Sequence, residues 1–345
     1  MLPRLKYLNL LLASVLLSGP TSAQFLTPPA VARLHAAQLA IVINDADPNS
    51  IVVGEYYRKA RNIAPANVLH VSIPGRPRRL DPVPFARLRE RIERQLDPAV
   101  QAVLLVWTAP YAVGCNAITA AFTLGYDATQ CTRPCAAGRP SAYYNASSAR
   151  PFTDFGLRLS MLLPTDSIAA SKAVIDRGVA SGFRPQPATA YYLHTSQTAR
   201  NVRASLFPRA GANAARQLRV ARLDADQLED ARDIIIYQTG MARVAGLEQL
   251  GFLPGALADH LTSFGGDLLG TEQMSSLRWL DAGATASYGT VSEPCNHWQK
   301  FPHPTVLLKH YAGGASAIEA YWRSVAWPAQ GLFIGEPLAA PYGRD

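Results

Sequence analysis

Residues 39–73 read LAIVINDADPNSIVVGEYYRKARNIAPANVLHVSI and contain the pattern that decides the fold. The apolar run at 39–45 is short and ends in turn-forming residues, which predicts a buried strand. Residues 47–50 (DPNS) supply the side chains that cap a helix, and the helix ends before Asn62. A second apolar run at 68–73 predicts another strand. Strand, helix and strand form a β-α-β unit, which is the seed of a parallel sheet.

The same alternation continues along the chain. Further helices are expected at 84–97, 166–180, 196–207, 305–311 and 315–325, and further strands at 102–108, 157–163, 188–194, 218–223, 233–238 and 331–337. Strands that alternate with helices indicate a three-layer α/β fold with a largely parallel central sheet. We expect an N-terminal segment at 24–150, with a cysteine-bearing excursion at 109–150, and a C-terminal part at 151–345.

The first 23 residues have the pattern of a secretory signal. A basic start is followed by an apolar run at 8–17 and by small residues that predict cleavage near Ala23. No later stretch approaches the roughly 20 apolar residues that a membrane-spanning helix needs. The sequence therefore predicts an exported chain, periplasmic or extracellular, without a transmembrane segment after cleavage.

The net charge of +8 is mostly arginine, and loss of the signal segment removes two of these positive charges. One dense patch consists of Arg76, Arg78, Arg79, Arg87, Arg89, Arg91 and Arg94. Because glutamates are interleaved with these arginines on an expected helix, we interpret the patch as a solvated face and expect no nucleic-acid partner. The sequence also predicts no cofactor.

The chain has four cysteines, at positions 115, 131, 135 and 295. An exported protein can form disulfides, and the simplest interpretation pairs cysteines within 115–135 and leaves Cys295 either paired or free. The count alone does not determine the connectivity.

The densest group of reactive side chains lies between residues 251 and 300. A cysteine hydrolase needs a thiolate, a base within hydrogen-bonding reach and backbone donors for an oxyanion. We predict Cys295 as the nucleophile and His260 as the base. The expected supporting residues are Asp259, Ser263, Gly265, Gly266, Asp267, Gly289, Glu293 and His297.

Four segments carry a resemblance to a known family: 41–71, PGALADHLTSFGG at 254–266, AGATASYGTVSEP at 282–294 and AQGLFIGEPLAAP at 329–341. Together they resemble an uncharacterised family of exported bacterial proteins found in genomes with exosortase-type protein sorting. This resemblance covers nearly all of the chain after the signal but implies no activity.

The C-terminal third is more distantly similar to the caspase-like cysteine peptidases of the gingipain and clostripain type. Those enzymes place a histidine after one central strand and a cysteine after the next, and a late strand ends in a Gly-Asp-Pro-like turn. Here His260, Cys295 and the segment 335–337 match that arrangement. The resemblance implies a caspase-like fold in the C-terminal part and a peptidase that uses His260 and Cys295.

Two alternatives remain open. Cys295, His297 and His303 could bind zinc, since a thiolate with imidazoles suits this metal. Alternatively, the chain could be a non-catalytic protein that binds a peptide or glycan at the carboxyl ends of the strands. Its cleft would then be lined by Trp107, Trp279, Tyr288, Trp298 and Phe301.

Overall fold

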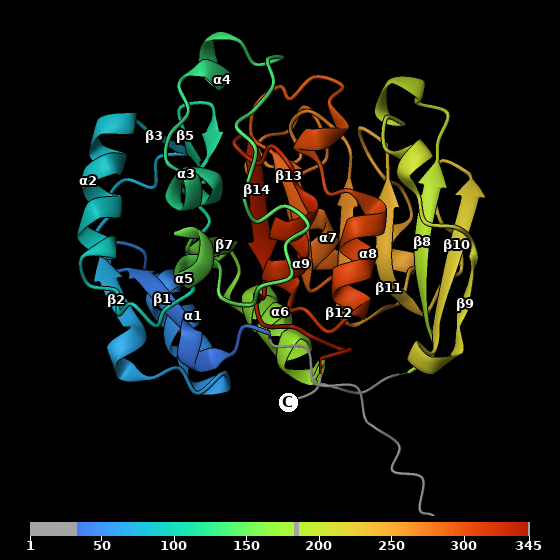
Figure 1. Cartoon of the computed structure of the whole chain (residues 1–345). Helices are drawn as coiled ribbons and strands as arrows, with labels where there is room; N and C mark the ends of the chain where they lie inside the picture. The colour runs from blue at the N-terminus through green and yellow to red at the C-terminus, as the bar shows by residue number, and fades with distance from the viewer. Residues whose placement is uncertain (1–32, 183–185, 344–345) are drawn as a thin grey trace, which may run out of the picture.

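The computed structural model describes residues 33–182 and 186–343, and a sheet of 11 strands runs through this part of the chain. The strand order is β2-β1-β4-β7-β14-β13-β12-β11-β8-β10-β9 (Figure 1). The expected signal segment lies outside the described residues. Strands from both expected segments, 24–150 and 151–345, share the sheet, and the boundary between these segments stays a prediction.

The first half of the sheet contains the predicted β-α-β unit. Its strands are β1 (Leu39–Asn44), β2 (Val68–Val71), β4 (Ala102–Val106) and β7 (Leu159–Leu163), all paired in parallel. α1 (Pro48–Ala60) follows β1, and the carboxylate of Asp47 caps it by accepting from the amide of Asn49 at 3.1 Å. Every residue of β1, β4 and β7 is buried, which explains their uninterrupted apolar runs.

The second half repeats the parallel pattern. Its strands are β8 (Ala188–His194), β9 (Gly211–Asn213), β10 (Leu218–Asp224), β11 (Ile234–Thr239), β12 (Phe252–His260), β13 (Ala286–Thr290) and β14 (Gly331–Gly335). Only β9 and β14 run antiparallel, to β10 and to β13 respectively. β14 also meets β7 through Ile334 and Leu162, and so it joins the two halves.

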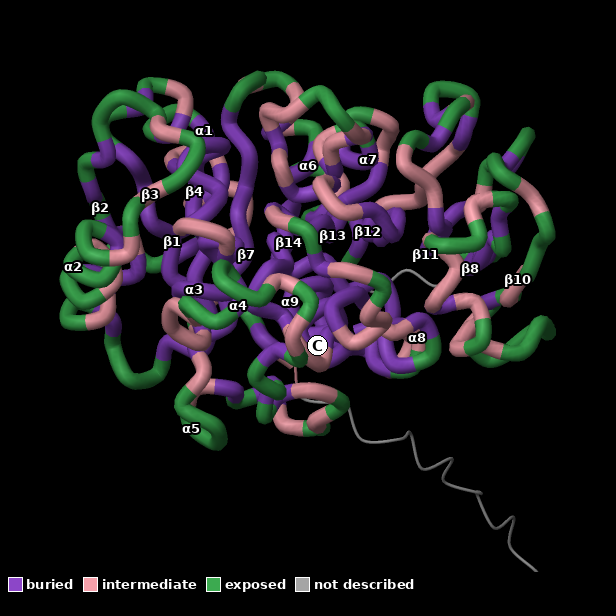
Figure 2. The backbone as a smooth tube through the Cα atoms, turned by 90° about the horizontal axis from the view of Figure 1, so that it is seen from above, coloured by how far each residue is buried: buried purple, intermediate pink, exposed green. Residues whose placement is uncertain are grey.

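Helices cover both faces of the sheet (Figure 2). One face carries α1, α6 (Ile168–Ala180) and α7 (Leu277–Ala282), and the other carries α3 (Ile118–Leu124), α8 (Pro304–Ala312) and α9 (Ala317–Ser324). The predicted three-layer α/β fold with a largely parallel sheet is confirmed. α2 (Pro82–Glu93) lies beside β2, and no helix of the described residues is both long and apolar enough to cross a membrane.

The segment between β4 and β7 includes residues 109–150, which were expected as a cysteine-bearing excursion and whose bounds stay a prediction. It contains two short helices, α4 (Thr129–Thr132) and α5 (Pro151–Phe155), besides α3. Three short strands, β3 (Arg79–Leu80), β5 (Ala112–Val113) and β6 (Asn116–Ala117), form a separate small sheet above the main one (Figure 1).

The prediction of a helix at 196–207 is wrong. Two single turns of 3₁₀-helix, Thr198–Arg200 and Ala204–Leu206, take its place. The side-chain amide of Asn201 donates to the carbonyl oxygen of Thr195 at 2.6 Å, and its carbonyl oxygen accepts from the Thr195 amide at 3.1 Å. Such local side-chain bonds compete with the helix, so the propensity of the segment did not decide its structure.

This irregular segment places Arg203 inside the protein. Its guanidinium donates to Asp259 of β12 at 2.5 Å and to the carbonyl oxygen of Thr239 at 3.0 Å. The side chains of Arg203 and Asp259 are only 2% and 1% exposed. Gln238 donates to the other carboxylate oxygen of Asp259 at 2.8 Å, so the buried charge is paired and hydrogen-bonded on both sides.

We expect Asp259→Ala to lower the free energy of unfolding by about 3–5 kcal/mol, because it leaves the Arg203 guanidinium buried without its carboxylate. Urea denaturation measures the loss. Glu90→Ala is the control, since it removes an exposed ion pair with Arg94 at 3.8 Å and should cost less than about 1 kcal/mol. Equal losses in the two variants would contradict a structural role for the Arg203–Asp259 pair.

Candidate functional site

His260 lies at the end of β12, where the sequence places a catalytic base, but its ring is enclosed. The indole of Trp279 donates to Nδ1 of His260 at 2.8 Å, and Nε2 lies 3.0 Å from the carbonyl oxygen of Met274. Since Nδ1 accepts, Nε2 carries the proton and donates. Both ring nitrogens are therefore occupied, and the residue is 1% exposed.

Burial also removes the basicity of this histidine. Desolvation disfavours the imidazolium and lowers the pKa of His260 to about 3. A general base is most effective with a pKa near the working pH. The predicted role of His260 as a base is thus opposed both by its hydrogen bonds and by its pKa.

Cys295 has no thiol to offer. It is joined to Cys135 in a disulfide, and Cys115 is joined to Cys131, so no cysteine is free. The nucleophile is a thiolate, so the disulfide corrects the prediction of Cys295 as nucleophile. The expectation of disulfides is confirmed, and Cys295 belongs to the paired alternative.

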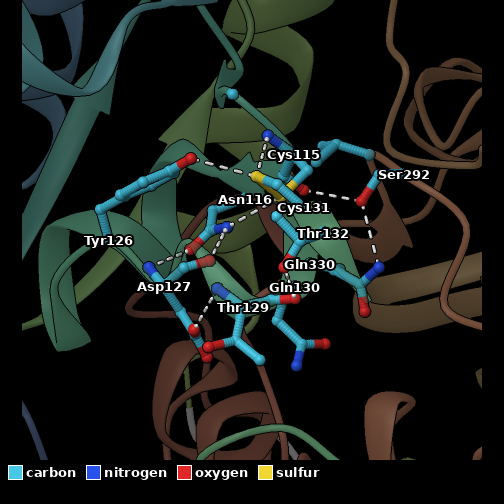
Figure 3. The surroundings of a disulfide bond; sticks show 12 residues. Cys115, Asn116, Tyr126, Asp127, Thr129, Gln130, Cys131, Thr132, Ser292 and Gln330 are labelled. Atoms are coloured by element: carbon cyan, nitrogen blue, oxygen red, sulfur yellow. Dashed lines mark hydrogen bonds between the residues drawn. A yellow bond between two sulfur atoms is a disulfide. The ribbon is translucent and has the colours of Figure 1, made fainter. Parts of the chain in front are cut away.

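The segment around Cys295 is fixed to the cysteine-bearing excursion. The hydroxyl of Ser292 donates to the carbonyl oxygen of Cys115 at 2.7 Å, and Gln330 donates to Ser292 at 3.1 Å (Figure 3). Lys300, which is 1% exposed, donates to Gln130 at 2.9 Å. These contacts hold the segment around Cys295 against residues 115–130, which are far away in the sequence.

Two of the three glycines predicted as oxyanion donors, Gly266 and Gly289, are used within the structure. A Cβ on Gly289 would lie 2.4 Å from the backbone of Gly265 and of Gly266, so only glycine permits the approach of these segments. The amide of Gly266 donates to the carbonyl oxygen of Thr290 at 2.8 Å and is not available to a ligand. The oxyanion role expected of Gly266 is therefore wrong.

The remaining predicted residues do not converge on one point. Asp267 is half-buried and accepts from the hydroxyl of Tyr111, and the carbonyl oxygen of Ser263 accepts from Thr290 at 2.9 Å. Glu293 is exposed and caps the amide of Cys295 at 2.8 Å. Burial raises the pKa of Asp259, which Arg203 and Gln238 oppose, and its carboxylate is already occupied by them.

The structure also bears on the two alternatives from the sequence, the zinc site and the cleft lined by aromatic side chains. His297 lies 2.8 Å from the carbonyl oxygen of Cys135, and His303 accepts from the amide of Val306 at 3.4 Å. With Cys295 in a disulfide, the zinc alternative has lost its thiolate ligand, and the described residues form no cluster of three metal-ligating side chains. Four of the five cleft aromatics are core residues with at most 1% exposure, namely Trp107, Trp279, Tyr288 and Phe301.

A better ligand site lies at the far end of the sheet, between β9, β10 and α8. We call it the β9 groove. Its volume of about 540 Å³ is within the usual range for a ligand site. Apolar side chains of β10 and α8 line it together with three cationic side chains. The lining residues used below are Leu218, Val220, Leu308, Arg209, Arg216 and Lys309.

Local structure positions the cations of the β9 groove. Asn213 caps the turn after β9 by accepting from the amide of Arg216 at 3.2 Å, and Gln217 adopts a left-handed conformation (φ 50°) that returns the chain into β10. Lys309 projects from α8, where it donates to Asn145 at 3.0 Å. The side chains of Arg209 and Arg216 form no hydrogen bond or ion pair with the described residues.

The sequence interpretation missed this groove, although a signal was present. No aspartate or glutamate occurs from residue 177 to residue 223, while six arginines occur between 200 and 222. Such a one-sided stretch must face solvent, a buried acid or an anionic ligand. One of the six, Arg203, meets the buried Asp259, whereas Arg209 and Arg216 reach the groove.

Comparison with known proteins gives only distant matches. No family model and no curated protein matches the sequence. Among solved structures, the RgpB pro- and mature-domain complex of Porphyromonas gingivalis matches with a TM-score of 0.44, covering 88% of this chain and 79% of that one. Gingipain R (RgpB) gives 0.45 with 90% and 79% covered, and a structure described as a protease gives 0.49 with 91% and 80%. All three are 10% identical to this chain, a level at which likeness carries no information about activity.

We expect the pH dependence of stability to report the buried His260. Its folded-state pKa of about 3 is below the unfolded value of 6.5, so the unfolded chain takes up this proton first and stability falls as pH drops below about 6.5. In urea denaturation at pH 7 and pH 5, His260→Gln should lose about 2 kcal/mol less than the unaltered protein, while His303 and His310, whose pKa values burial also lowers, still contribute to the loss. A His260 imidazole signal, assigned by its loss in His260→Gln, that titrates between pH 6 and 7 by NMR would contradict this placement.

The two disulfides should differ in their effect on stability. Cys135 and Cys295 are 160 residues apart, and Cys115 and Cys131 only 16. Because loop-closure entropy grows with loop length, the serine double variant of the longer loop should be less stable by about 2 kcal/mol than that of the shorter one. Chemical denaturation measures both, and the reverse order would contradict the pairing.

Proposed function

We propose that this chain is an exported, non-catalytic binding protein that holds an extended acidic peptide in the β9 groove. Two disulfides fit an oxidising compartment outside the cytoplasm. The observation that carries the proposal is the lining of the groove, which combines Arg209, Arg216 and Lys309 with apolar side chains and includes no carboxylate.

The charges favour an acidic ligand. Guanidinium groups without a protein partner attract carboxylates and bind them through paired hydrogen bonds. The side chains of Leu218, Val220 and Leu308 also line the groove and supply apolar contact with a ligand. Exposed ion pairs alone contribute little binding free energy. A ligand with alternating acidic and apolar side chains matches both features.

The backbone favours a peptide. Among the described strands β9 pairs with β10 alone, so the amides and carbonyls of its outer edge have no strand beside them. All three residues of β9 are exposed. An extended peptide can add to such an edge through main-chain hydrogen bonds, while its side chains alternate between the groove and solvent.

A labelled peptide of alternating glutamate and valine is the direct probe. It should bind more tightly than the lysine–valine peptide of equal length, as measured by fluorescence anisotropy. Arg209→Glu with Arg216→Glu should weaken the binding about tenfold, since each exposed ion pair contributes up to about 1 kcal/mol. N-methylation of alternate amides of the peptide should weaken it further by removing edge-strand donors.

Arg87→Glu with Arg91→Glu is the matched control, because it makes the same change in net charge at the opposite end of the sheet. Equal loss in both double variants, or equal binding of the lysine peptide, would overturn the proposal. A parallel casein-cleavage assay with and without reductant tests the cysteine hydrolase predicted from the sequence. That activity requires a reduced Cys295, so cleavage that disappears in Cys295→Ala would replace the binding function.

A further inference from the structure

A second groove runs along α2 at the other end of the sheet. We call it the α2 groove. It has a volume of about 570 Å³ and lies between α2 and the segment that follows β2. Figure 1 shows where α2 lies. Its apolar wall consists of Ile73, Leu80, Leu88, Pro74, Pro77 and Pro84. No aromatic side chain lines it.

Three arginines line this groove, namely Arg87 and Arg91 of α2 and Arg94, the C-cap residue of that helix. Their spacing of four and three residues keeps them on one side of the helix, with steps of about 6 Å and about 4.5 Å along its axis. Glu90 also lines the groove and lies 3.8 Å from Arg94. Arg87 and Arg91 have no side-chain hydrogen bond or ion pair with the described residues.

The other arginines of the same patch are used structurally. Arg76 pairs with Asp166, and Arg79 donates to the carbonyl oxygen of Val291 at 2.9 Å. Arg89 donates to the carbonyl oxygen of Phe122 at 2.7 Å. The patch is therefore not one uniformly solvated face. Arg87 and Arg91, which line the α2 groove, are among the arginines of the patch that have no partner in the described residues.

We propose that the α2 groove binds an acidic polysaccharide. A chain of uronate sugars carries one carboxylate on each unit, and this regular repeat suits a row of guanidinium groups one helical turn apart. The flat apolar faces of the sugar rings would pack on the proline wall. This inference does not depend on the peptide proposed for the β9 groove, because the two sites use different residues at opposite ends of the sheet.

The groove chemistry disfavours the other polyanions and a peptide. A single-stranded nucleic acid is normally held by aromatic stacking as well as by charge, and the groove has no aromatic ring. Three wall residues are prolines, which have no amide hydrogen, and no strand of the main sheet lines the groove. Main-chain pairing with a peptide is therefore weak here, in contrast to the β9 groove.

Isothermal titration of the full chain with oligogalacturonate tests the inference. We expect binding that weakens as salt increases, and at least a tenfold weaker affinity for the methyl-esterified oligomer, which has the same backbone but no charge. Arg87→Glu with Arg91→Glu should reduce the affinity at least tenfold. Arg232→Glu with Arg278→Glu, at exposed arginines that line neither groove, should leave it within twofold, which separates a site from the general positive charge.

Three outcomes would overturn the inference. They are equal binding of the methyl ester, equal losses in the two double variants, and tighter binding of a thymidine oligonucleotide than of oligogalacturonate. Both pairs of arginines are at least partly exposed, so unchanged melting temperatures should show that the variants fold. Arg91→Gln provides a milder variant, with a smaller loss expected at the same groove.

Discussion

The carboxylate of Glu336 holds the last strand of the chain against the first helix. This side chain is fully buried and accepts from Tyr57 at 2.7 Å and from Arg61 at 2.9 and 2.7 Å. A buried carboxylate without partners is strongly unfavourable, so these three bonds fix where the chain can pass. Glu336 directly follows β14, and Tyr57 and Arg61 lie at the end of α1. The contact therefore ties the end of the sequence to the N-terminal β-α-β unit, and β14 lies between β7 and β13 as the strand that makes one sheet from two halves.

Most strands were predictable because both faces of the sheet are covered, but β9, β12 and β13 were not among the strands expected from the apolar runs. An apolar run such as 102–106 is buried at every position, and the sequence shows this directly. The prediction of a helix at 196–207 failed for a different reason. The structure of this segment depends on the hydrogen bond of Asn201 to Thr195 and on the ion pair of Arg203 with Asp259, which is 56 residues away in sequence. Periodicity reports which face is apolar, but it does not reveal a distant charge that one arginine will meet.

The residues of the candidate site also depend on contacts that are distant in sequence and that sequence patterns do not reveal. Sequence reasoning correctly placed His260 at a strand end, yet its chemistry depends on Trp279 and on the carbonyl oxygen of Met274, which enclose the ring. Cys295 was recognised as a reactive or structural residue, and only its partner Cys135, 160 residues earlier, decides between the two. The charges of the β9 groove were visible as an acid-free stretch, but the groove itself forms only when α8 packs beside β10.

Both grooves lie beside the edge strands of the sheet, and this position has a physical consequence. An open sheet edge can pair with the edge of another copy, and proteins commonly prevent this with charged side chains, prolines and short strands. Here β9 has three residues and is flanked by Arg209 and Arg216, while α2 and a proline-rich segment lie beside β2. Like charges on two copies repel each other, whereas an acidic ligand is attracted by the same side chains. The arginines that oppose pairing between the edges of two copies are thus the same groups that we propose to bind an anionic partner.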